Sequence, residues 1–327
     1  MTDTAATLTT HPSDIEAIGP QASGESGIRA RIRFHQSWYR QHILKLPRYG
    51  STEPHSGSRS MGSILHPEDA AAGKNFTTPS AVDLYQARRR EGWGVDPIRC
   101  TRYLTSSQAL TINLLAPLKE DPDWAARSLS GLLDMNVKRI TKTDIEFAPQ
   151  RRSLHLGDMT RLDAWIHLET ESGPLGLALE VKYSDRFNSR HLKVCENPKY
   201  QALANETGLW NLSDRRTQSR PVNQLLRCHA LAASLWTATH KRGELPSILI
   251  LHHPSDQSAP KTVELYREAL NRPDLLKVAS LDQLVSQMAI TATSKYQRTA
   301  IQTLRIRYLD HDLSEASWMK YLDNRRT

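Results

Sequence analysis

Two adjacent stretches form the most regular pattern of hydrophobic and polar positions in the chain. Residues 162–168 alternate Leu, Ala, Ile and Leu with Asp, Trp and His, and residues 175–181 form an almost continuous apolar run. This combination predicts a half-buried strand beside a fully buried strand. Ser172-Gly173-Pro174 between them indicates a turn, so we expect an antiparallel hairpin.

A helical period organises most of the remaining chain. The clearest case is residues 222–239, where Leu225, Ala232 and Trp236 are spaced to share one face. Further helices are expected at residues 29–46, 79–90, 105–115, 122–135, 262–270, 281–288 and 295–321. Further strands are expected at 140–149, 247–252 and 276–279, and the Gly-, Pro- and Ser-rich residues 49–73 indicate a long loop.

This order of elements predicts an α/β fold with a mixed sheet of four or five strands flanked by helices and a helical N-terminal portion. We expect three segments. Residues 1–27 have few large apolar side chains and should form a flexible leader. Residues 28–135 should form the helical N-terminal portion, packed on a core of residues 136–327 that includes the C-terminal helices.

The distribution of charge favours a polyanionic partner. The 327 residues include 43 Lys and Arg and 35 Asp and Glu, for a formal net charge of +8. Four of the acidic residues and none of the basic ones lie in residues 1–27, so the remainder is more basic still. Nucleic acid is the first candidate partner, and an anionic membrane surface is the second.

Cysteine usage and hydropathy exclude several other classes. Cys100, Cys195 and Cys228 are odd in number and far apart, which argues against a disulfide framework and a cysteine-based zinc site. No apolar run has the length of a transmembrane helix, and the first residues lack a signal-peptide pattern. We therefore expect a cytoplasmic protein and, of the two candidate partners, nucleic acid and not a membrane.

Candidate chemistry lies where the hairpin strands meet charged residues. Glu180 and Lys182 are separated by one residue and so share a strand face, and antiparallel pairing can bring Asp163 beside them. Two carboxylates can hold Mg²⁺ while leaving positions open for water and phosphate oxygen. The lysine would orient or deprotonate the attacking water and offset charge on the phosphate. The alternative is a surface hairpin in which Glu180 and Lys182 pair and bind nothing.

The same residues carry a resemblance to a known family. Asp163, followed after sixteen residues by Glu180-Val181-Lys182, resembles the signature of the PD-(D/E)XK nuclease superfamily, although Leu162 stands where that signature has proline. Gln224-Leu225-Leu226-Arg227 is similar to the Q-x-x-R-like helix motif of several of its branches. The segments SSQALTINLLAPL, GDMTRLDA and LEVKYSDRF, within roughly residues 100–255, also resemble a bacterial family of uncharacterised restriction-endonuclease-like proteins.

The resemblance implies a restriction-endonuclease-like core and a metal-dependent nuclease that hydrolyses phosphodiester bonds, with DNA as the expected substrate. Asp163 and Glu180 would hold Mg²⁺, for which Mn²⁺ can substitute, and Lys182 would assist the attacking water. Gln224 and Arg227 would contribute to the same site from their helix.

Three further residues are candidates for a supporting role next to the metal-binding residues. Gln108 lies on a helix from which superfamily members often place an acidic residue beside the metal, but that stretch contains no Glu here. Arg161 shares the strand face of Asp163 and should either pair with that carboxylate or a phosphate, or simply be exposed. Glu146, on the preceding strand, could support the metal ligands from behind, but the favoured interpretation is a strand residue that faces solvent.

A non-catalytic nucleic-acid-binding or assembly subunit that keeps the fold is the alternative function. The presence of all three of Asp163, Glu180 and Lys182 favours the nuclease, because a degenerate copy would be expected to lose one of them. The sequence leaves a homodimer open.

The basic composition generates a first prediction. Affinity for nucleic acid should fall steeply as salt rises, because lysines and arginines that neutralise phosphates release counterions. A fluorescence-anisotropy titration at several salt concentrations measures this dependence. An affinity that stays constant between low and physiological ionic strength would remove nucleic acid as the partner.

Overall fold

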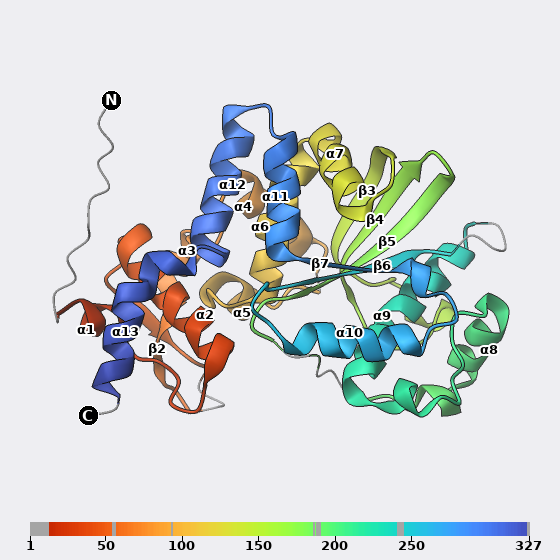
Figure 1. The fold of residues 1–327 in the computed structure, drawn as a ribbon, viewed down its shortest axis with the longest axis horizontal. Helices are drawn as coiled ribbons and strands as arrows, with labels where there is room; N and C mark the ends of the chain where they lie inside the picture. Colours follow the sequence, from red (N-terminus) through yellow and green to blue (C-terminus); the bar gives the residue numbers. More distant parts are fainter. Residues whose placement is uncertain are drawn as a thin grey trace. The chain divides into compact units, whose positions relative to one another are not determined.

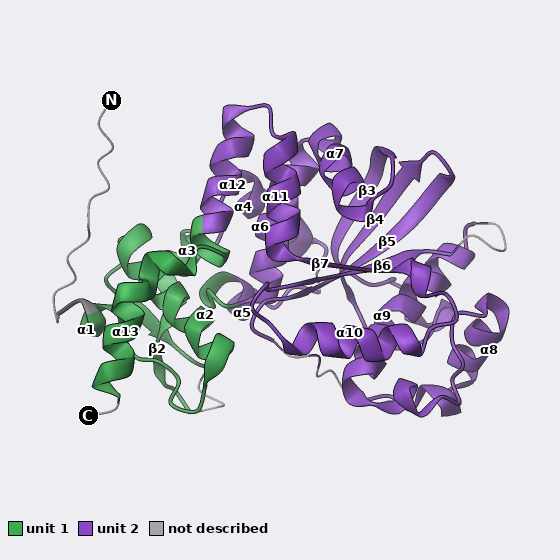
Figure 2. Ribbon diagram, in the orientation of Figure 1, with its two compact units in different colours: residues 1–75, 101–105, 306–327 green, residues 76–100, 106–305 purple. Residues whose placement is uncertain are grey.

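The computed structural model describes residues 13–53, 57–92, 94–185, 187, 191–240 and 245–325. These residues form two compact units, which are coloured separately in Figure 2. Unit 1 contains the described residues up to 75, residues 101–105 and those from 306 onwards, and unit 2 contains residues 76–100 and 106–305. This division differs from the predicted segments 1–27, 28–135 and 136–327, because residues near both ends of the sequence share unit 1.

Unit 1 combines a two-stranded antiparallel sheet with short helices. Its elements are α1 (Ser13–Ile18), α2 (Gly27–Trp38), β1 (Tyr49–Ser51), β2 (Ser60–Leu65), α3 (Pro67–Ala71) and α13 (Glu315–Asn324). The loop predicted for residues 49–73 is therefore wrong. Two of the glycines that suggested it are positions of close backbone approach, since a Cβ atom would collide with the backbone of Leu65 at Gly50 and with that of Ile18 at Gly62.

The segment expected to be a flexible leader is folded where the structure describes it. Ile18 in α1 is buried and packs with Phe34, Trp38 and Tyr39. The carboxylate of Glu25 lies 2.6 Å from the guanidinium of Arg33. Residues 1–12 lie outside the described residues.

The last residues of the sequence complete the core of unit 1. The buried imidazole of His35 has its Nδ1 atom 2.8 Å from the hydroxyl of Ser314 and its Nε2 atom 2.9 Å from the carbonyl of Ile306. Neighbouring Phe34 packs against Trp318, with ring centroids 5.1 Å apart. Helix α2 therefore depends on residues encoded far from it.

Unit 2 contains a five-stranded mixed sheet with the order β3-β4-β5-β6-β7. The strands are β3 (Val137–Phe147), β4 (Leu162–Thr170), β5 (Gly173–Lys182), β6 (Ser247–His252) and β7 (Leu276–Ser280). The first three pair antiparallel, and β5, β6 and β7 pair parallel. The prediction of an α/β fold with a mixed sheet of four or five strands flanked by helices is confirmed.

Helices cover both faces of this sheet (Figure 1). One face carries α6 (Ser107–Glu120), α7 (Pro122–Leu133) and α11 (Leu281–Thr291), with α4 (Pro79–Arg90) packed on α6. The other carries α9 (Arg220–Thr237), with α8 (Pro198–Thr207) and α10 (Ser258–Glu268) beside it. Helix α9 is the crossover that the parallel pair β5 and β6 requires.

Two helices, α5 (Pro97–Arg102) and α12 (Lys295–Tyr308), contain residues of both units. Within the described part of the chain, no helix combines the length and the apolar character needed to cross a membrane.

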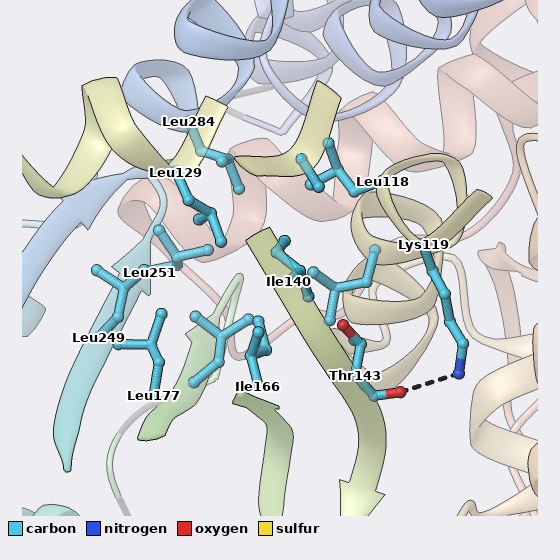
Figure 3. Close-up of a pocket in the computed structure, with 13 residues that line it drawn as sticks. Leu118, Lys119, Leu129, Ile140, Thr143, Ile166, Leu177, Leu249, Leu251 and Leu284 are labelled. Atoms are coloured by element: carbon cyan, nitrogen blue, oxygen red, sulfur yellow. Dashed lines mark hydrogen bonds between the residues drawn. The ribbon is translucent and has the colours of Figure 1, made fainter. Parts of the chain in front are cut away.

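The strand alternation of β5 separates two environments. Leu177 and Leu179 line an apolar cavity of about 20 Å³ that is closed by Leu129 and Leu284 from the helices above (Figure 3). At its edge, Lys119 donates a hydrogen bond of 2.9 Å to the carbonyl of Thr143. Because residues alternate between faces, Ala178 and Glu180 point to the opposite side, toward α9.

Two tryptophans fill the α9 side of the sheet above a glycine. Trp165 and Trp236 meet nearly at right angles with ring centroids 6.0 Å apart. A Cβ atom at Gly176 would lie 2.6 Å from the Trp236 ring and would also collide with Trp165. The glycine is therefore required by packing.

Gly176→Ala should destabilise the protein by about 1–3 kcal/mol, because neither large ring can move without disturbing a packed core. Gly24→Ala is the matched control, since a Cβ atom there would have no neighbour within 4 Å. Chemical denaturation of both variants measures the effect. Equal unfolding midpoints for the two variants would show that the tryptophan pair adjusts freely.

Candidate active site

Asp163 and Glu180 lie opposite each other on β4 and β5. The pairing of Ala164 with Leu179 fixes this register. The main-chain N–H of Val181 donates a hydrogen bond of 2.7 Å to Oδ2 of Asp163. The carboxylate on one strand is thus held by the backbone of the other, and the hairpin fixes the relative positions of both acids.

Lys182 lies on the same face of β5 as Glu180. Its Nζ atom is 2.6 Å from Oε1 of Glu180, and both side chains are more than nine-tenths buried. Burial disfavours the charged lysine, but Glu180 and Asp163 outweigh this effect and raise the pKa of Lys182 above its ordinary value. Lys182 is therefore a fixed positive charge in this arrangement.

Helix α9 supplies two further contacts to Glu180. Gln224 donates a hydrogen bond of 2.7 Å from Nε2 to Oε1, and the Sγ atom of Cys228 lies 3.4 Å from Oε2. Burial, followed by the charge of Glu180, raises the pKa of the Cys228 thiol well above its usual range. The cysteine is a neutral donor beneath the carboxylate.

Arg227, three residues after Gln224, has a different partner. Its guanidinium donates two hydrogen bonds of 2.6 Å to the carboxylate of Asp158, which also accepts one of 2.7 Å from the hydroxyl of Tyr200. Burial opposes the ionised acid, yet these donors lower the pKa of Asp158 to about 2. Arg227 thus anchors the β3–β4 loop, residues 148–161, which leads into Asp163.

Gln108 and Arg161 both meet Glu146. Gln108, in the first turn of α6, is close enough to Glu146 to lower the pKa of that carboxyl, and it accepts a hydrogen bond of 3.1 Å from the N–H of Asp96. The Nε atom of Arg161 lies 4.0 Å from Oε2 of Glu146, and its side chain is 40% exposed. Arg161 was expected either to pair with Asp163 or a phosphate, or to be exposed. It is partly exposed, and the carboxylate that it approaches is that of Glu146.

The prediction that Glu146 faces solvent is wrong, because its side chain is only 3% exposed. Its backbone has a φ of +46°, a left-handed conformation that interrupts the alternation of the strand. Arg88 stabilises this conformation by donating hydrogen bonds of 2.8 Å to the carbonyls of Ile145 and Glu146. Burial raises the pKa of Glu146 to about 7.

The sequence contained a partial signal for Glu146. It stands at the end of a strand next to an Arg-rich loop, and it would lie opposite Asp163 once the register of β3 on β4 was known. That register is a long-range property, so strand alternation alone assigned the residue to the wrong environment.

Among the residues that the structure describes, no three His, Cys, Asp or Glu side chains form a group already arranged to hold a metal ion. Glu180 is instead neutralised by Lys182 and accepts a hydrogen bond from Gln224. The residues nevertheless fit a hard divalent cation. Within the described part of the chain, Oε1 of Glu146 is buried without a hydrogen-bond partner. Burial, together with Glu180 and Glu146, raises the pKa of Asp163 well above its usual range. Such uncompensated oxygen ligands are those that Mg²⁺ or Mn²⁺ prefers.

Comparison with family models matches residues 23–310 to the model described as the PD-(D/E)XK nuclease superfamily. The match includes β4, β5 and α9 and covers most of the chain. Comparison with curated proteins gives no match, and comparison with solved structures gives none either.

The buried pair of Arg227 and Asp158 generates a stability prediction. Asp158→Asn should lower the free energy of unfolding by about 3 kcal/mol at neutral pH, because a buried guanidinium loses its counter-charge. Since folding lowers the pKa of Asp158 from 3.8 to about 2, its contribution is complete above pH 4 and is lost as the pH falls toward 2. Denaturation at several pH values measures both effects. A variant that loses stability as steeply as the parent between pH 4 and 2 would contradict the assignment.

Proposed function

Because the chain belongs to the PD-(D/E)XK nuclease superfamily, we propose that it is a metal-dependent nuclease that hydrolyses phosphodiester bonds, with DNA as its substrate and the cytoplasm as its location. One observation carries the proposal. Asp163, Glu180 and Lys182 meet at one end of the β4–β5 hairpin, where acids and a lysine are held in fixed register.

Each residue has a distinct role in this proposal. Asp163 and Glu180 would hold Mg²⁺ or Mn²⁺, which when bound activates water and polarises the phosphate. Lys182, kept protonated by its neighbours, orients the attacking water and offsets charge that develops on the phosphate. Gln224 keeps the Glu180 carboxylate in position. Arg227 acts indirectly, by holding the loop that precedes Asp163.

The β3–β4 loop supports nucleic acid as the substrate class. It exposes Arg151 and part of Arg161, together with two apolar side chains, Leu154 at 72% and Met159 at 71%. Arginines of this kind neutralise phosphates, and exposed apolar side chains can contact bases. The Arg227 and Asp158 pair braces this loop, which leads along the chain into Asp163.

A specific observation favours the alternative of a non-catalytic subunit. Glu180 is already paired with Lys182, and among the described residues no ready-made metal-binding group is present. Such a protein would bind nucleic acid without cutting it. Divalent-ion binding separates the two functions, because only the nuclease requires it.

The direct test is a substrate panel. Purified protein is incubated with plasmid, linear duplex, single-stranded DNA and RNA in the presence of Mg²⁺, Mn²⁺ or a chelator. Cleavage of DNA that depends on the divalent ion supports the proposal. Binding of DNA without cleavage under every condition supports the non-catalytic alternative.

Substitutions in the hairpin should separate ligand and charge roles. Asp163→Ala and Glu180→Ala should lose metal binding and cleavage, because no neighbour replaces the removed carboxylate. Lys182→Ala should lower the cleavage rate by about a hundredfold or more while metal binding survives or strengthens. Calorimetry and a plasmid-nicking assay measure the two properties.

Glu169→Ala is the control for these variants, since it removes a carboxylate that is 45% exposed at the far end of β4. It should cleave like the parent. Full activity of Asp163→Ala in Mg²⁺ would show that the hairpin is only a scaffold.

A further inference from the structure

Three carboxylates form a row across three adjacent strands. The pairing of Ile145 with Ala164, and of Phe147 with Leu162, places Glu146 opposite Asp163. The register of β4 on β5 in turn places Asp163 opposite Glu180. Directly opposed residues on antiparallel strands have Cβ atoms about 5 Å apart, and like charges at that separation destabilise a sheet. Such a row is stable only if one of the carboxyl groups is protonated or a positive charge compensates it.

The neighbours of Glu146 compensate it only in part. Arg161 approaches Oε2 no closer than 4.0 Å and is 40% exposed, and Gln108 is a neutral neighbour that carries no charge to offset the carboxylate. The other oxygen, Oε1, is buried and has no hydrogen-bond partner within the described residues. An ionised carboxylate with an unsatisfied buried oxygen is costly unless something binds it.

The backbone conformation at Glu146 keeps its carboxylate buried although an unsatisfied oxygen there is energetically unfavourable. A left-handed φ of +46° is uncommon for a residue with a side chain, and such conformations cluster at functional sites. The guanidinium of Arg88, 6% exposed, stabilises it through the carbonyls of Ile145 and Glu146. The position of this carboxylate is therefore fixed from the main chain.

Glu180 differs from Glu146 because both of its carboxylate oxygens have partners. Its Oε1 accepts hydrogen bonds from Lys182 and Gln224, and its Oε2 faces Cys228. Oε1 of Glu146 has no comparable partner among the described residues. An incoming cation therefore meets an unengaged carboxylate oxygen at Glu146.

We infer that Glu146 is a third carboxylate ligand, which binds a hard divalent cation through Oε1 beside Asp163. The inference rests on the proposed function and extends it, because Glu146 lies on β3, outside the hairpin. A third negative ligand raises the charge of the site and so its affinity for Mg²⁺ and Mn²⁺.

The test compares Glu146→Gln with Glu169→Gln, which makes the same chemical change at the far end of β4. Isothermal titration of the full chain with Mn²⁺, without nucleic acid, should show an affinity lowered by about tenfold or more for Glu146→Gln and unchanged for Glu169→Gln. The metal-free melting temperature of Glu146→Gln should equal or exceed that of the parent, because a buried like charge is removed. Its stabilisation by Mn²⁺ should shrink.

The outcomes distinguish a failure of this inference from a failure of the proposed function. If the parent binds Mn²⁺ and Glu146→Gln binds it equally well, Glu146 is a structural residue and only this inference fails. If the parent binds neither Mn²⁺ nor Mg²⁺, the proposed function fails, and the inference fails with it. Should Glu146→Gln not fold, Glu146→Asp replaces it: weaker Mn²⁺ binding at an unchanged metal-free melting temperature supports the inference, and parental affinity overturns it.

Discussion

Burial of like charge at one end of the β4–β5 hairpin is the constraint on which the arrangement of unit 2 depends. Glu146 and Glu180 are almost completely buried, and Asp163 stands between them in the sheet. Carboxylates in such a place are tolerated only with donors at hand. The N–H of Val181 and the ammonium of Lys182 reach them because the register is correct. A shift of the β4–β5 register by one residue would turn Asp163 to the leucine-lined face of the sheet and leave the donors on β5 unpaired.

Helix α9 packs on the sheet and also contacts residues of the candidate site. Leu225 and Trp236 belong to its buried apolar face and pack under the strands. Gln224 and Arg227, three residues apart, are neighbours on the helix surface, and they hold Glu180 and Asp158. The same helix therefore positions a carboxylate of the hairpin and the loop that precedes β4. The hydrophobic packing of α9 on the sheet fixes the positions of Gln224 and Arg227, and so of these polar contacts.

The parts of this molecule that could be predicted from sequence are those set by local pattern. Alternation and a turn signal defined the hairpin, and a 3.6-residue period defined α9, so the relation of Glu180 to Lys182 followed directly. The environment of Glu146 did not follow, because a single left-handed residue breaks the alternation that the prediction assumes. The partner of Arg227 lies 69 residues away in sequence, and only the folded chain joins them. Glycines in residues 49–73 were ambiguous for a similar reason, since close packing of backbones and free loops select the same residue.

Unit 1 draws its core from both ends of the sequence, with unit 2 encoded between them. Helix α2 is synthesised before the residues of unit 2, but Ile306, Ser314 and Trp318, which contact its buried side, are synthesised after them. At ordinary rates of translation the chain between them takes about 15 to 50 s to synthesise. Throughout that interval α2 lacks these three partners, while the residues of unit 2 emerge and can form their sheet. The packing of α2 is therefore completed only after unit 2 has been synthesised, so the core of unit 1 closes later than the sheet of unit 2 can form.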